Sequence, residues 1–211
     1  MLDAKRKQGK PLGKLHGVVV AIKDVICYKG HQVSAASKML ENFIAPYDAT
    51  VITKLKQQDA IFVGKVNLDE FAMGLTTEFS AYGPSKNPWN TDYVRGGSSG
   101  GSAVAVQANM CHCALGSDTG GSIRQPSAFT GSFGFKPTYG LISRFGLLAY
   151  ASSFDQIGPM TKSLEDNMLL TEIMAGFDQH DATMRQQPAD KYTTAVAPKK
   201  AKFAVMNEAI H

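Results

Sequence analysis

Residues 96–124, GGSSGGSAVAVQANMCHCALGSDTGGSIR, decide the fold prediction. Two glycine–serine loops, 96–102 and 116–124, stand at the two ends of this stretch. Between them, the small and apolar residues 100–110 predict a helix, and residues 111–115 predict a short strand. A glycine-rich loop leading into a helix, then a strand and a second such loop, is typical of an α/β protein.

The same alternation of strands and helices extends outward through the rest of the chain. Ser163 stands three residues before Asp166 and forms a near capping box at the start of a helix. The predicted fold class is α/β, with a single domain over residues 1–211. The further predicted elements are strands at 17–22 (GVVVAI), 61–66 and 202–206, helices at 49–58, 122–129 and 163–175, and a polar surface segment at 178–201.

Composition excludes several classes of protein. The chain has 211 residues, 44% hydrophobic and 19% charged, and no apolar run approaches the roughly 18 residues of a membrane span. Residues 1–14 carry the whole net charge of +4, so a broad nucleic-acid-binding face is not expected and any nucleic acid would be held by a partner. Three cysteines and no signal peptide favour the cytoplasm or an organelle matrix.

The two glycine–serine loops are candidates for binding a phosphate or a developing oxyanion, although tight turns would explain either loop alone. Neither loop has the lysine of a P-loop. Residues 96–100 fit G-x-S-x-G, but the preceding TDYVR is a poor strand for a nucleophile elbow. A serine–histidine hydrolase is also disfavoured, because no histidine lies in a glycine-rich context; the five are His16, His31, His112, His180 and His211.

A base for these serines is expected from Lys23, which follows the apolar strand GVVVAI. Burial lowers the pKa of a lysine, and a neutral lysine can act as a general base toward a serine. The alternative is that Lys23 pairs with Asp24 or extends to solvent. No metal site is predicted, because strand alternation places His112 on the face opposite Cys111 and Cys113.

Three motifs resemble the amidase signature family: VVVAIKD around Lys23, GGSSGGSA around Ser98 and GSDTGGSIRQP around Ser122. The resemblance implies a mixed, twisted β-sheet wrapped by helices. It also implies that Ser122 is the nucleophile, that a cis peptide bond precedes Ser98, and that Lys23 takes the proton through Ser98. The implied oxyanion hole consists of the N–H groups of Thr119, Gly120, Gly121 and Ser122, and the implied supporting residues are Ser99, Asp118 and Arg124, the last two either paired or solvated.

Four further stretches, at 68–74, 80–90, 134–147 and 151–159, are similar to the ammonia-generating subunits of tRNA-dependent amidotransferases in that family. Such a subunit hydrolyses glutamine through a glutamyl-serine ester. The ammonia passes to a partner that uses ATP and Mg²⁺ to convert Glu-tRNA(Gln) to Gln-tRNA(Gln). The resemblance therefore implies two partners, a tRNA-binding B subunit and a small C subunit, and no cofactor, no direct grip on tRNA and no membrane contact in this chain.

The chain departs from the family pattern at Val25, where asparagine is common, and at Thr130, where cysteine is common. Family members are also much longer. The resemblance thus implies a domain truncated at both ends, without an N-terminal helical segment or the C-terminal half that grips glutamine, and so marginally stable and poorly active alone. Two alternatives stay open: a stand-alone amidase that hydrolyses small amides, and a non-catalytic scaffold whose loops bind an anion.

Overall fold

The computed structural model describes residues 2–186, 191–194 and 200. The predicted strand at 202–206 lies outside the described residues, as does part of the polar segment 178–201. In the described part of the chain, no helix is long and apolar enough to cross a membrane.

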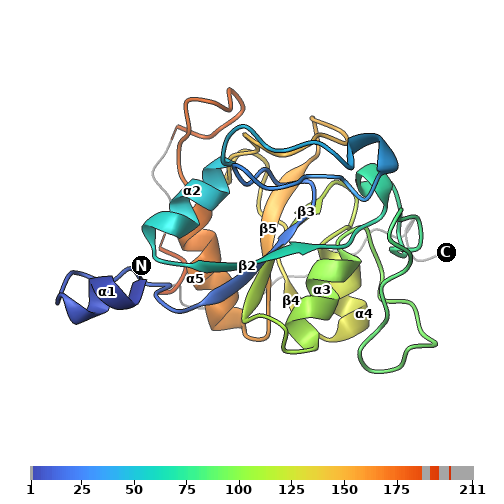
Figure 1. The fold of residues 1–211 in the computed structure, drawn as a ribbon, viewed down its shortest axis with the longest axis horizontal. Coiled ribbons are helices and arrows are strands. Elements are labelled where there is room, and N and C mark those ends of the chain that lie inside the picture. The colour runs from blue at the N-terminus through green and yellow to red at the C-terminus, as the bar shows by residue number, and fades with distance from the viewer. Residues whose placement is uncertain (1, 187–190, 195–199, 201–211) are drawn as a thin grey trace.

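A single mixed sheet of five strands organises the described residues, in the order β2-β1-β3-β5-β4 (Figure 1). The three strands β2, β1 and β3 are parallel, while β5 runs antiparallel to both β3 and β4. This confirms the predicted α/β class with a mixed sheet. The strands are β1 (Val19–Lys23), β2 (Ile61–Val66), β3 (Cys113–Asp118), β4 (Phe133–Gly134) and β5 (Gln156–Thr161).

Helices cover both faces of the sheet (Figure 1). Val20 and Ile22 of β1 point to the face covered by α2 and α5, where they share a core with buried residues of both helices. Ala21 points to the other face and packs with α3, whose close approach the small side chains allow. The helices are α1 (Leu2–Lys7), α2 (Thr50–Gln57), α3 (Gly100–Gln107), α4 (Arg124–Thr130) and α5 (Leu164–Met174), with 3-10 turns at Lys38–Leu40 and Glu70–Ala72.

Most predicted elements are present, with shifted ends. The strand predicted at 61–66 is confirmed residue for residue, and the strand predicted at 111–115 begins two residues later and continues to Asp118. The Ser163 cap is confirmed, since its hydroxyl accepts a hydrogen bond from the Asp166 amide at 3.1 Å. Strands β4 and β5 were not predicted, because Gly158 and Pro159 interrupt the apolar pattern of β5.

Candidate active site

The two glycine–serine loops meet at the carboxyl ends of β1 and β3. Ser99 joins them: its amide donates to the Ser122 carbonyl at 3.1 Å, and its hydroxyl donates to the Ser117 carbonyl at 3.0 Å. Lys23 ends β1 at the same edge of the sheet. The carboxyl edge of parallel strands is where ligands bind in α/β sheets. The structure therefore brings Lys23 and both serine loops to one place.

Lys23 is fully buried, and its Nζ lies among hydroxyl groups rather than carboxylates. It is 2.8 Å from Ser98 Oγ, 2.9 Å from Ser117 Oγ and 3.4 Å from the Ser117 carbonyl. Burial lowers the pKa of Lys23 to about 7, and the carboxylates of Asp69, Asp118 and Asp155 oppose that shift without contacting the amine. A large share of Lys23 is therefore neutral at neutral pH, as a general base must be.

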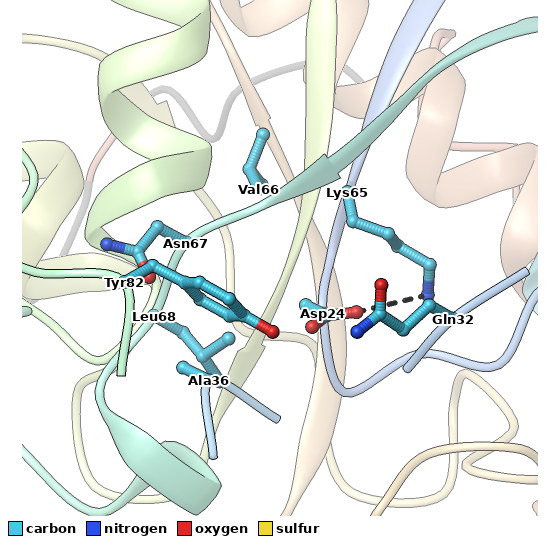
Figure 2. A pocket seen from close by; sticks show the side chains of 8 residues that line it. All are labelled: Asp24, Gln32, Ala36, Lys65, Val66, Asn67, Leu68 and Tyr82. Carbon is cyan, nitrogen blue, oxygen red and sulfur yellow. Dashed lines mark ion pairs between the residues drawn. The ribbon is translucent and has the colours of Figure 1, made fainter. Parts of the chain in front are cut away.

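Asp24 does not pair with Lys23. Figure 2 shows its carboxylate facing Lys65 instead, with 3.8 Å between Lys65 Nζ and Asp24 Oδ1. The other carboxylate oxygen accepts hydrogen bonds from the amide and hydroxyl of Ser34. This pair lines a cavity of about 350 Å³ together with Tyr82 and Gln32. The Lys23 amine contacts Ser98 and Ser117 instead, so the structure does not have the alternative Lys23–Asp24 pair.

The two catalytic-candidate serines differ in accessibility. Ser98 is fully buried and follows a cis Gly97–Ser98 peptide bond, whereas Ser122 is 8% exposed. A Cβ atom at Gly97 would lie 2.2 Å from Asp69 Oδ2, so only glycine fits there. No hydrogen bond joins Ser98 Oγ to Ser122 Oγ within the described residues. Hydrogen bonds between catalytic groups are often long in a free enzyme and tighten when substrate binds.

Asp118 holds the second loop in shape. Its carboxylate accepts hydrogen bonds from the amides of Gly121, Ile123 and Arg124 at 2.7, 3.0 and 3.3 Å. The Arg124 guanidinium adds two contacts of 3.1 Å each. Burial acts to raise the pKa of Asp118, but the hydrogen bonds from Arg124 and the loop amides outweigh it and lower that pKa. Of the two arrangements left open by the sequence, the structure has Asp118 and Arg124 paired.

The four expected oxyanion donors are not equivalent. The Gly121 N–H points to Asp118, whereas the N–H groups of Thr119, Gly120 and Ser122 form no hydrogen bond with any described residue. A Cβ atom placed at Gly120 would meet nothing within 4 Å, so the space beside this residue is open. Three backbone donors therefore remain for a negatively charged oxygen.

Sequence reasoning missed three residues at this site. Ser117 contacts Lys23 directly, and Thr77 binds the first loop by donating to the Gly96 carbonyl at 2.8 Å and accepting from the Gly100 amide at 3.1 Å. Asp155 accepts a hydrogen bond from the Thr119 hydroxyl. The sequence signal that could have indicated such residues is a polar side chain next to a buried apolar run, such as Ser117 after CALG.

The histidines and cysteines among the described residues form no hydrogen bond with Lys23, Ser98 or Ser122. His112 accepts a hydrogen bond from the Val19 amide and is exposed, while Cys111 and Cys113 are buried. The two thiols do not share a face as predicted: Cys111 precedes β3 and packs with Ala21, whereas Cys113 packs in the other core cluster with Val20 and Ile22. Burial raises the pKa of both thiols. Within the described residues, no group of three side chains of the metal-binding types His, Cys, Asp and Glu comes together.

The amidase family model matches residues 1–211. The chain belongs to the amidase family. It is 59% identical over 186 residues to the A subunit of the glutamyl-tRNA(Gln) amidotransferase of Chlamydia felis, covering 88% of this chain and 38% of that protein. The corresponding protein of Cenarchaeum symbiosum is 56% identical over 182 residues, or 86% of this chain and 38% of that protein. The chain thus spans about two fifths of the length of these relatives.

Solved structures give the same fold. The A subunit of the glutamyl-tRNA(Gln) amidotransferase of Thermotoga maritima matches with a TM-score of 0.82 and 54% identity, over 84% of this chain and 39% of that one. The peptide amidase of Stenotrophomonas maltophilia matches with a TM-score of 0.85 and 38% identity, over 91% of this chain and 41% of that one. The described residues therefore have the amidase fold, as the sequence resemblance implied.

Proposed function

We propose that this chain carries the glutamine-hydrolysing centre of an amidotransferase that converts Glu-tRNA(Gln) to Gln-tRNA(Gln). One observation carries the chemistry: a fully buried lysine at 2.8 Å from Ser98, beside a serine loop with three unoccupied backbone donors. The choice among amidases is supported by the names of the relatives, whose identities of 56% and 59% exceed the 38% found for the peptide amidase.

In the proposed reaction, neutral Lys23 accepts the Ser98 proton while Ser98 accepts that of Ser122. Ser122 Oγ then attacks the side-chain amide carbon of glutamine. The negative charge moves to the former carbonyl oxygen, which accepts hydrogen bonds from the N–H groups of Thr119, Gly120 and Ser122. The proton returns through Ser98 to the amide nitrogen, and the C–N bond breaks. Ammonia departs, and the glutamyl group remains bound to Ser122 as an ester. Water, deprotonated by the same route, hydrolyses the ester to glutamate.

The ammonia would be consumed in a partner. We propose a tRNA-binding B subunit, where ATP and Mg²⁺ activate the glutamate of Glu-tRNA(Gln), together with a small C subunit. This chain itself would need no cofactor. A cytoplasmic or organelle-matrix location follows from that role in tRNA synthesis.

The decisive experiment is Ser122→Ala in the full natural protein assembled with its partners. We expect glutamine hydrolysis to be abolished, and hydroxylamine to trap glutamyl hydroxamate from the wild-type ester but not from the variant. Hydrolysis retained by Ser122→Ala would refute the proposal.

Two other functions remain testable in the same preparation. A stand-alone amidase, which the similarity to the peptide amidase favours, would hydrolyse aryl amides or asparagine as well as glutamine. A non-catalytic scaffold would show no turnover of glutamine, asparagine or aryl amides, and inorganic phosphate alone would raise its melting temperature.

A further inference from the structure

One residue supplies two of the three polar contacts made by the Lys23 amine. Ser117 offers its hydroxyl at 2.9 Å and its carbonyl at 3.4 Å, and Ser98 offers the third contact at 2.8 Å. Ser117 is itself held in place, because its amide donates to Ser99 Oγ at 3.3 Å and its carbonyl accepts from Ser99 Oγ at 3.0 Å. It is 6% exposed, so water has little access to this arrangement.

The number of hydrogens on the amine makes these contacts consequential. A neutral amine has two N–H donors and one lone pair, whereas an ammonium has three donors and none. The Ser117 carbonyl can only accept a hydrogen bond. If the Ser117 hydroxyl also accepts one, both hydrogens of neutral Lys23 are used, and its lone pair is left for the hydroxyl proton of Ser98.

We propose that Ser117 is a positioning residue that directs the lone pair of neutral Lys23 toward Ser98. The inference rests on the proposed function, because it matters only if Ser98 passes a proton to Lys23. Without the Ser117 hydroxyl, one N–H of the amine has no acceptor there and turns to Ser98. Ser98 then accepts a hydrogen bond from Lys23 and cannot donate its proton to it.

The same hydroxyl also affects the charge of Lys23. Hydrogen bonds from an ammonium are stronger than those from a neutral amine, so loss of the acceptor destabilises the charged form more. The buried carboxylates of Asp69, Asp118 and Asp155, which favour the charged form, stay in place. Removal of the hydroxyl is therefore expected to shift the acid limb of the kcat/KM profile to lower pH, even as the plateau rate falls.

The test compares Ser117→Thr with Ser117→Val in the full natural protein, because these two side chains have the same shape and differ in the hydroxyl. Glutamine hydrolysis is measured from pH 5 to pH 9. Threonine should retain kcat within about threefold of wild type, while valine should lower it about 100-fold with KM within threefold. The acid limb should move down by about half a pH unit in the valine variant only.

Ser102→Ala is the matched control, since Ser102 is also a buried serine but donates to the Leu115 carbonyl, away from Lys23. It should keep kcat within threefold. If the added methyl group prevents folding of the threonine and valine variants, Ser117→Ala is compared with Ser102→Ala by the same two readouts. Equal rates within a pair, or a lower rate with an unmoved acid limb, overturn the inference. Failure of the proposed function would look different, as wild-type hydrolysis would then be absent or independent of Ser122.

Discussion

Lys23, which is fully buried, and Lys65, which is half-buried, lie on neighbouring parallel strands but face opposite sides of the sheet. The register pairs Ile22 with Lys65 and Lys23 with Val66. Because side chains alternate along a strand, this offset of one residue places the two amines on opposite faces of the sheet. Burial is the main cause that lowers the pKa of each. Lys65 nevertheless has the Asp24 carboxylate at 3.8 Å and donates to the Ile26 carbonyl, whereas Lys23 contacts only serine groups.

The neighbours of the two amines therefore separate a lysine held in an ion pair from the lysine proposed as a general base. A carboxylate beside an amine stabilises the ammonium form and fixes it as half of an ion pair. Hydroxyl groups can donate or accept, so they accommodate both the charged and the neutral amine. Lys23 can therefore change its protonation state during a reaction with little rearrangement of its surroundings.

The largest expected effect comes from replacing each lysine by methionine, which keeps the length of the side chain and removes the amine. Lys23→Met should lower kcat for glutamine hydrolysis by at least about three orders of magnitude, because the general base is lost. Lys65→Met should keep kcat within about fivefold. Steady-state ammonia release from both variants makes the measurement. If Lys23→Met came within tenfold of wild type, general-base catalysis by Lys23 would be untenable.

A smaller effect is expected on stability when the structural pair is broken. Asp24→Asn leaves the Lys65 ammonium, whose side chain is 18% exposed, without its carboxylate. We expect a loss of about 1–3 kcal/mol in the free energy of unfolding, typical of an unsatisfied buried polar group, with kcat within threefold. Urea denaturation of the variant and wild type would measure it.

The double variant Asp24→Asn/Lys65→Met serves as the control for that loss. Removing both charges together leaves none uncompensated, so the double variant should recover part of the stability lost by Asp24→Asn. Purely additive losses would show that the two side chains do not act as a pair.

Local pattern predicted the buried strand before Lys23 and singled out both serine loops, and the need of those serines for a base favoured a buried Lys23. The run GVVVAI predicts a buried strand, and a lysine at the end of such a strand either stays in the interior or extends to solvent. The family motifs then supplied Ser98 and Ser122. The same pattern predicted β2 correctly, but it assigned no role to Lys65, because the contact with Asp24 depends on the pairing of two strands that are far apart in the sequence.

Contacts set by loop geometry could not be predicted. The Gly121 amide resembles its three neighbours in sequence, yet the turn directs it to Asp118, three residues earlier in the chain. Ser117 was missed because the predicted strand ended at 115, so no side-chain direction was assigned to it. Asp155 reaches Thr119 only because β5 pairs with β3, and Pro159 concealed that strand.

The smallest expected effect tests the two lysines by the pH dependence of stability. The pKa of Lys23 is about 7 in the folded state against an ordinary value of 10.5, so between these values the unfolded chain binds more protons. The contribution of Lys23 to the free energy of unfolding therefore rises with pH from about 7 to about 10.5. Below pH 7 the folded protein carries the whole free-energy cost of burying the charged amine. Lys23→Met removes that cost, so its melting temperature should exceed that of wild type by a few degrees at pH 6, and the difference should shrink as the pH rises toward 9.

Lys65→Met should instead have a lower melting temperature than wild type at pH 6, because it leaves Asp24 without its cation. A Lys23→Met difference that stays constant from pH 6 to pH 9 would mean that folded Lys23 keeps its charge throughout, and the contrast between the two lysines would fail.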